Sequence, residues 1–335
     1  MLDSELDFLT EAKNSEKCLE NFRKLSPHIA SYVYAPKVYW NLSTSKLLTM
    51  EYMDGAYVND VKAIKKLGIR PHELSVLVSQ TFAEMMFKHG FVHCDPHAAN
   101  MLVRPMPSSK ASILGVIDDK AWVAMAVVAL PSSFATLVLL CSLLYPVDPK
   151  PPVLELDFNT RANYAALWKA LIFSDANGIK ECSIKLGVGE DLYPLFAGVL
   201  TMRPWNRVID PSMDHLVIHG SESDRSELQM YASEYFHEIS ELLRRLPRVI
   251  LLMMKTNDCL RAVNNTLIQG SSLETFFIIG KVSSEAVIEA KMSQSKSVLT
   301  WFNIKLDKIV LEMRLWAMQM ALLLLQLRKA LPWSH

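Results

Sequence analysis

The stretch Phe91-Val-His-Cys-Asp-Pro-His-Ala-Ala-Asn100 places Asp95 and Asn100 on one short polar loop. Phosphoryl transfer needs a carboxylate that orients the attacking hydroxyl or water, and oxygen ligands for magnesium around the phosphates. An aspartate and an asparagine at this spacing supply both, and Mg²⁺ prefers such hard oxygen ligands. The spacing also allows a plain turn that Asp95-Pro96 starts and Asn100 caps.

A second chemical interpretation of the same loop uses His93, Cys94 and His97 as zinc ligands. Structural zinc sites take four ligands that usually come in two pairs, and the sequence offers no matching second pair. Zinc is therefore the weaker of the two chemical hypotheses.

Composition excludes several classes of protein. The chain has 335 residues, half of them apolar, with 35 Lys+Arg against 35 Asp+Glu. This length fits one large or two modest domains, and the neutral balance gives no argument for binding nucleic acid. Five dispersed cysteines indicate reduced thiols, and the acidic N-terminus shows no targeting peptide. The first glycine is Gly55, so no glycine-rich phosphate loop precedes it.

The first third of the chain predicts a helix, a hairpin and a second helix. Ser4 is the expected cap of a helix that runs to Leu25, with Asp7 reaching back to it. Lys37–Trp40 and Lys46–Tyr52 are rich in β-forming residues and predict a hairpin. A second helix is expected from Pro71 to Gly90.

Beyond that helix, the loop 91–100 should lead into a short strand, Met101–Val103. From Asn159 onward the pattern is mostly helical.

An uncharged run from Ala121 to Val147 is long enough to span a bilayer. Pro131 divides it into arms that are each too short to cross as a helix, so we expect a disordered or loosely helical excursion instead of an anchor. Leu315 to Leu327 is also uncharged but fits a buried or interfacial helix better.

Taken together, these motifs resemble the UbiB/aarF-type atypical kinases. The loop 91–100 looks like the family's catalytic loop, whose usual form ends His-Pro-Gly-Asn. Glu5-Leu-Asp7 resembles its Glu-x-Asp element, and Glu11 stands where the αC glutamate is expected. The resemblance covers about residues 3–110 and 155–330 and is closest to the aarF-domain-containing kinase subgroup.

Further stretches carry the same resemblance. Leu48–Gly55 looks like the hinge strand, where the backbone of Glu51, Tyr52 and Met53 would meet adenine. Lys255–Arg261 is similar to a family stretch in the C-terminal helices.

The sequence also departs from the family. Its lysine-x-glycine-glutamine helix, alanine-rich nucleotide loop and third-strand lysine should precede Glu5, yet no lysine occurs before Lys13. The family-like part is therefore expected to be truncated at the N-terminus. Ala98-Ala99 replaces Pro-Gly in the catalytic loop. Either Asp118, after an expected strand at Ile113–Ile117, is the metal aspartate, or about 116–154 comes from misread or alternatively spliced message.

The resemblance implies an α+β, atypical protein-kinase-like fold. It consists of a small-lobe remnant with the hinge (1–55), the start of a helical large lobe with the catalytic loop (56–115), an atypical hydrophobic insertion (116–154), and the rest of the large lobe with a helical C-terminal extension (155–335).

The resemblance also implies a function. We expect ATP and Mg²⁺ as cofactors, Asp95 and Asn100 as catalytic residues, and Asn100 with Asp118 on the metal. A lipid or quinone ligand, membrane association and a mitochondrial or plastid location are further expectations. The alternative is a catalytically impaired, pseudokinase-like binding module or a partial gene model.

Overall fold

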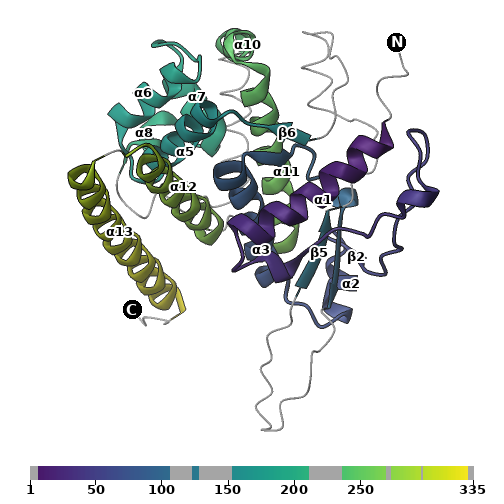
Figure 1. The fold of residues 1–335 in the computed structure, drawn as a ribbon. Coiled ribbons are helices and arrows are strands. Elements are labelled where there is room, and N and C mark those ends of the chain that lie inside the picture. Colours follow the sequence, from purple (N-terminus) through teal and green to yellow (C-terminus); the bar gives the residue numbers. More distant parts are fainter. Residues whose placement is uncertain are drawn as a thin grey trace. The chain divides into compact units, whose positions relative to one another are not determined.

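The computed structural model describes residues 7–105, 123–127, 153–210, 236–268, 273–295 and 297–330 (Figure 1). These residues form two compact units. Unit 1 holds 7–74, 91–105, 123–127 and 153–155, and unit 2 holds 75–90 and the described residues from 156 onward. The described residues are mostly helical, with two small sheets, which confirms the expected α+β class.

Unit 1 begins with helix α1 (Phe8–Leu25), which buries Ala12 and Phe22. Asp7 is its N-cap, because its carboxylate accepts a hydrogen bond from the Leu9 amide at 3.1 Å. The expectation that Ser4 caps the helix, with Asp7 inside the first turn, is therefore wrong. A cap residue lies outside the helix that it closes, so α1 starts later than expected.

The expected hairpin is present as an irregular pairing. Isolated bridges join Val38 to Met50 and Thr44 to Leu47, and the Glu51 amide donates to the Lys37 carbonyl at 2.8 Å. Two 3₁₀ turns, η1 (Ala30–Tyr32) and η2 (Trp40–Leu42), interrupt the extended chain.

A four-stranded sheet follows the order β1-β5-β4-β2. Its strands are β1 (Val33–Tyr34), β5 (Val123–Val127), β4 (Met101–Pro105) and β2 (Ala56–Tyr57). β1 is parallel to β5, and the other two pairings are antiparallel. The predicted strand at Met101–Val103 is confirmed and extends to Pro105.

β5 corrects the expectation of a disordered or loosely helical segment, because five residues of the uncharged run form an inner strand of this sheet. A short apolar run fits a buried strand as well as a helix, and the strand finds partners on both sides. The remainder of 121–150, like Ile113–Ile117, lies outside the described residues.

A two-stranded antiparallel sheet pairs β3 (Phe91–His93) with β6 (Val153–Glu155). The expectation that the loop begins at Phe91 is therefore wrong by these three residues, which a distant partner holds in a strand. Helix α2 (Val61–Lys66) completes unit 1, and α3 (Pro71–Ala83) continues from it into unit 2.

α3 runs directly into a π-helical stretch, η3 (Glu84–His89), which ends at Gly90 with φ of +65°. The predicted helix from Pro71 to Gly90 is confirmed, although its last turns are π-helical. A left-handed residue at this place suits glycine, which has no Cβ to clash.

The remaining helices of unit 2 confirm the mostly helical pattern predicted after Asn159. They are α5 (Phe158–Ile172), α6 (Ala176–Lys185), α7 (Tyr193–Thr201), α8 (Trp205–Val208), α10 (Phe236–Arg245), α11 (Arg248–Ile268), α12 (Leu273–Gln294) and α13 (Val298–Ala330).

The core of unit 2 forms where α5 packs against η3 and α12. Phe87 stacks on Tyr164, and Trp168 meets the ring edges of Tyr164 and Phe276. Gly280 of α12 brings its backbone against the side chain of Ile172. In the described part of the chain, no helix has the length and apolar character that crossing a membrane requires.

Candidate functional site

The loop with Asp95 and Asn100 is anchored at both ends by strands of unit 1. β3 ends at His93, a 3₁₀ turn η4 (Ala98–Asn100) follows, and β4 begins at Met101. The Asn100 side-chain amide donates to the Asp95 carbonyl at 3.0 Å, and its backbone amide donates to the His97 carbonyl at 2.8 Å. The structure thus brings the two predicted residues together through this side-chain contact.

The other side-chain atom of Asn100 is not satisfied. Asn100 is only 2% exposed, and its Oδ1 has no hydrogen-bond partner among the described residues. A buried carbonyl oxygen without a partner costs free energy, roughly 1–3 kcal/mol, and a bound ion or an ordered water would remove that cost. An amide oxygen held in this way is a suitable ligand for a hard cation.

His93 orients the start of the loop. Its Nδ1 accepts a hydrogen bond from the Asp95 amide at 3.3 Å, and the ring is buried. An accepting Nδ1 carries no proton, which leaves the proton of a neutral ring on Nε2.

The zinc hypothesis gains nothing from this geometry. Cys94 is buried, and its Sγ lies 3.7 Å from the Val92 carbonyl. Within the described ranges, no group of three or more His, Cys, Asp or Glu side chains could hold a metal ion.

The predicted hinge is held beside the strand that leaves Asn100. β2 pairs with β4, and the Val58 amide donates to the Met101 carbonyl at 3.1 Å. A Cβ on Gly55 would lie 2.7 Å from the Val103 carbonyl oxygen, so only glycine allows this close approach. Sheet pairing therefore fixes the chain after the hinge to the chain after the catalytic loop.

The three hinge residues differ in their surroundings. The Glu51 carboxylate accepts hydrogen bonds from the Tyr34 hydroxyl and, at 3.2 Å, from the Lys37 amide. The Tyr34 contact is the main cause of the lowered pKa of Glu51. Met53 is buried and Tyr52 is 87% exposed, and the backbone of neither makes a hydrogen bond with another described residue.

Of the predicted α1 residues, Asp7 and Glu11 are described and Glu5 lies outside the described residues. Asp7 is engaged in capping, with Oδ2 also accepting from the Thr10 hydroxyl at 2.7 Å. Glu11 is half-buried, and burial raises its pKa to about 7. It forms no ion pair with a described side chain.

Lys17 is a residue that sequence reasoning missed. It forms an ion pair with Glu155 of β6 at 2.6 Å and lies 4.7 Å from the ring centroid of Phe91 in β3. It thereby ties α1 to the strand that enters the catalytic loop. Both partners are far away in sequence, so no local pattern could have indicated the role.

Asp118 lies outside the described residues. In the antiparallel β4–β5 pair, Val127 faces Met101 and Val123 faces Pro105. The C-terminal end of β5 is therefore the end next to Asn100.

The family-like stretch Lys255–Arg261 has a structural role in unit 2. Asn257 Nδ2 and Arg261 Nη1 both donate to the Leu200 carbonyl, at 3.2 and 2.9 Å. They satisfy a carbonyl at the C-terminal end of α7, which the helix itself leaves unpaired.

The sequence of this chain matches a family of known proteins. Residues 1–118 match the ABC1 atypical kinase-like domain. An ABC1 protein of Arabidopsis thaliana is 66% identical over 330 residues, which is 98% of this chain and 57% of that protein.

Animal relatives are more distant. AarF domain-containing protein kinase 1 of Xenopus laevis is 34% identical over 309 residues, 92% of this chain and 51% of the relative. AarF domain-containing kinase 1 of Drosophila melanogaster is 32% identical over 308 residues, 91% of this chain and 52% of the relative. The chain spans about half the length of these curated relatives. The matched domain and the similarity over nearly the whole chain agree, and the chain belongs to the ABC1/AarF family of atypical kinases.

Proposed function

We propose that this chain carries the nucleotide and metal site of an atypical kinase or ATPase, which binds ATP with Mg²⁺ in a protein-kinase-like fold. The observation that carries the proposal is Asn100, buried, fixed by the Asp95 carbonyl, and left with an unpaired Oδ1. A buried oxygen without a partner among the described residues, on the loop that resembles a catalytic loop, fits a magnesium ligand.

The residues of unit 1 take distinct roles in this proposal. Asp95 orients the attacking hydroxyl or water, and Asn100 Oδ1 holds the metal. The backbone of Tyr52 and Met53 meets the adenine ring, beside the Glu51 amide that already pairs with Lys37. When bound, magnesium neutralises charge on the phosphates.

Asp118 is the second metal ligand in this proposal, as the sequence predicts. Asp118→Asn should raise the Mg²⁺ concentration that ATP binding requires, which a Mg²⁺ titration of ATP binding measures. An unchanged Mg²⁺ requirement would remove Asp118 from the site.

A binding module without turnover is the second candidate. Glu11 has no cationic partner among the described residues. Without a cation paired to Glu11 to hold the phosphates, we expect this chain to bind ATP·Mg weakly. Micromolar affinity by calorimetry would contradict that expectation.

Association with a membrane, a lipid or quinone ligand, and a mitochondrial or plastid location belong to the proposal on family resemblance alone.

The test of catalysis uses a full-length form with the equivalent loop. Asp95→Asn and Asn100→Ala should each lower ATP hydrolysis by roughly a hundredfold or more, because orientation and metal coordination act as a unit. Asn100→Asp keeps an oxygen ligand and should retain Mg²⁺-dependent nucleotide binding. Asn206→Ala, on an exposed position of α8, is the matched control. Near-normal hydrolysis by Asp95→Asn would refute the assigned roles.

A further inference from the structure

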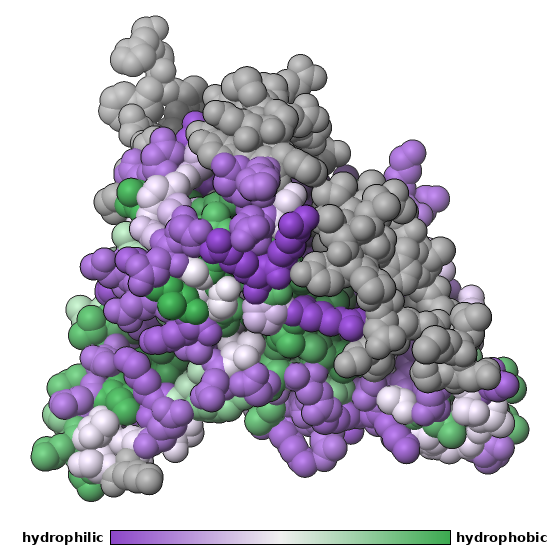
Figure 2. All heavy atoms as spheres, turned by 90° about the horizontal axis from the view of Figure 1, so that it is seen from above, coloured by the Kyte–Doolittle hydropathy of each residue, from purple (hydrophilic) through white to green (hydrophobic). Residues whose placement is uncertain are grey.

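Helix α13 has two apolar faces, and only one of them is covered within the described residues. Ile304, Leu311 and Leu315 are 5–6% exposed and pack in a cluster with Ile288 of α12. On the opposite side, large apolar side chains are exposed, among them Leu299 at 78% and Met313 at 66%. Hydrophobic side chains, drawn in green, reach the surface between hydrophilic ones in the space-filling view (Figure 2).

Seven of the eleven large apolar side chains that are exposed on α13 follow one line along the helix. We call this line the exposed seam. It consists of Leu299, Phe302, Leu306, Ile309, Met313, Trp316 and Met320. The intervals alternate between three and four residues, which is the spacing of a coiled-coil seam and keeps all seven on one side over roughly 33 Å of helix. A seam of this kind is shaped to receive another helix.

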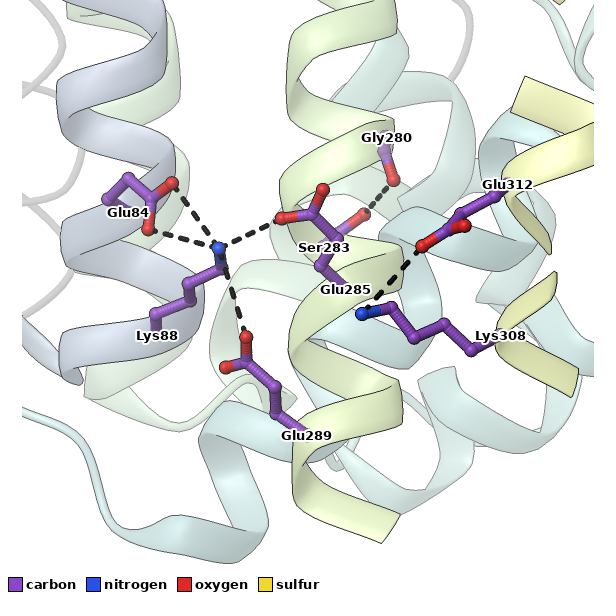
Figure 3. A network of polar contacts seen from close by, with 8 residues as sticks. All are labelled: Glu84, Lys88, Gly280, Ser283, Glu285, Glu289, Lys308 and Glu312. Carbon is purple, nitrogen blue, oxygen red and sulfur yellow. Dashed lines mark hydrogen bonds and ion pairs between the residues drawn. The ribbon is translucent and has the colours of Figure 1, made fainter. Parts of the chain in front are cut away.

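Charged side chains follow one edge of the exposed seam. Lys305 and Glu312 both occupy the position just before a seam residue, one heptad apart. Both sites border solvent, where Glu312 pairs with Lys308 at 3.7 Å (Figure 3). This edge therefore carries a cation and an anion one heptad apart. In an antiparallel pair of identical helices, each of them can face the opposite charge on the second copy.

We propose that α13 associates with α13 of a second copy of this chain as an antiparallel pair along the exposed seam. Centred between Leu306 and Ile309, the pairing places Leu306 against Ile309 of the second copy. It likewise places Phe302 against Met313 and Leu299 against Trp316. Each layer is apolar, and Lys305 then meets Glu312 of the second copy, twice by symmetry.

A parallel pair lacks this complementarity. In heptad notation, Lys305 and Glu312 occupy g positions. In a parallel coiled coil, each g residue faces the e residue that lies five positions further along the partner helix. Lys305 would then face Val310, and Glu312 would face Ala317. Charges placed against apolar side chains gain nothing from association, so the charge pattern favours the antiparallel arrangement.

The same charges favour a second copy over a lipid surface. Residues 298–324 carry three cationic and two acidic side chains, and Lys308 already pairs with Glu312. Helices that lie on anionic membranes are rich in Lys and Arg along the polar face. The nearly balanced charge of α13, with an acidic residue at the edge of the exposed seam, therefore favours binding to a second copy of α13.

The test is the oligomeric state of the full chain by sedimentation equilibrium. We expect a monomer–dimer equilibrium in the wild-type chain. Lys305→Glu should weaken it by about tenfold or more, since two attractive pairs become repulsive. Lys305→Glu with Glu312→Lys restores opposite charges and should restore the dimer. Lys62→Glu, on exposed α2, is the control for a change in net charge.

Three outcomes would overturn the proposal. They are a wild-type chain that stays monomeric, a dimer that Lys305→Glu does not weaken, and a double variant no tighter than the single one. A monomer that co-sediments with phosphatidylcholine–phosphatidylserine vesicles through Leu306, lost in Leu306→Asp, would assign the seam to a membrane surface instead.

Discussion

Two polar groups of unit 1 and the charge cluster of unit 2 differ in how they are paired, although both units bury unpaired polar atoms among the described residues. Unit 1 is built from short strands and turns, and Glu11 and Asn100, which are half-buried and buried, each keep an oxygen unpaired within the described residues. Unit 2 is built from long helices, and its buried carboxylate Glu84, 1% exposed, pairs with Lys88 at 3.4 Å. A ligand site needs polar atoms that are not already hydrogen-bonded within the protein. Paired buried charges instead fix how the helices pack.

The charge cluster of unit 2 illustrates the contrast (Figure 3). Lys88 Nζ lies 3.4 Å from Glu84, 2.9 Å from Glu285 and 3.9 Å from Glu289. Burial alone would lower the pKa of Lys88, but the hydrogen bond to Glu285 and the three carboxylate charges raise it. The cluster joins η3 to α12, and Arg161 donates to the Lys88 carbonyl from α5. Each of the four charged side chains in it has an opposite charge within 4 Å.

The largest effect should come from removing the central cation. Lys88→Met leaves Glu84, 1% exposed, as a buried charge without its partner, and we expect a loss of about 3–5 kcal/mol in the free energy of unfolding. Denaturant unfolding of the chain measures it. Lys281→Met, an exposed position on α12, should change little. Glu84→Gln combined with Lys88→Met should recover most of the loss. If the single variant were as stable as wild type, unit 2 would not depend on the pairing.

A smaller effect should follow from filling the α5–α12 contact. In Gly280→Ala the new Cβ would lie 1.9 Å from Ile172 Cδ1, so the side chain must shift, at a cost of about 1–3 kcal/mol. Ile172→Val removes Cδ1. Thermal unfolding of both single variants and the double variant forms a cycle.

The double variant should be more stable than the sum of the two single changes predicts, because the methyl groups compete for one space. If the stability losses of the two single variants simply add in the double variant, the α5–α12 contact can rearrange to accept the extra methyl group. That outcome would contradict the tight packing that we infer for unit 2.

The success of sequence reasoning also differs between the units. The helices of unit 2 follow from periodicity, which is local. In unit 1 the strand Phe91–His93 depends on Val153–Glu155, and the strand Val123–Val127 depends on partners before and after it in the chain. Pairing across such separations leaves no local signal, so both were missed.

Within the candidate site, residue types were easier to predict than contacts. Asp95 and Asn100 follow from the motif, but the hydrogen bond that leaves Asn100 Oδ1 unpaired depends on three-dimensional placement. The same holds for Lys17, whose partners come from two other elements. The uncharged run hid β5 because apolar composition alone does not separate strand from helix.

The smallest effect that still separates the units is the pH dependence of stability. Burial raises the pKa of Glu11 in unit 1 to about 7 from an ordinary value of 4.5, so the folded state binds the proton more tightly. Stability from this group is present below pH 4.5 and is lost as pH rises through about 7.

His89 in unit 2 behaves in the opposite way. Burial first, then Lys88 and Arg161, lowers its pKa to about 4 from 6.5. The stability that neutral His89 contributes is therefore present above pH 6.5 and is lost as pH falls from about 6.5 toward 4.

Glu11→Gln removes the first dependence and leaves the second. We expect it to stabilise α1 by about 1 kcal/mol at pH 8, a figure reduced from the full shift because Glu11 is only half-buried. At pH 4.5 the variant should match wild type, since the wild-type carboxyl is then protonated in the fold. Amide hydrogen exchange, resolved by segment, measures α1 of unit 1 and η3 of unit 2 in one experiment. Slower exchange in α1 at pH 8, with η3 unchanged, is the expected result. Faster exchange in α1 would mean that the Glu11 carboxylate already has a favourable cationic partner, and it would contradict the unpaired carboxylate that we describe.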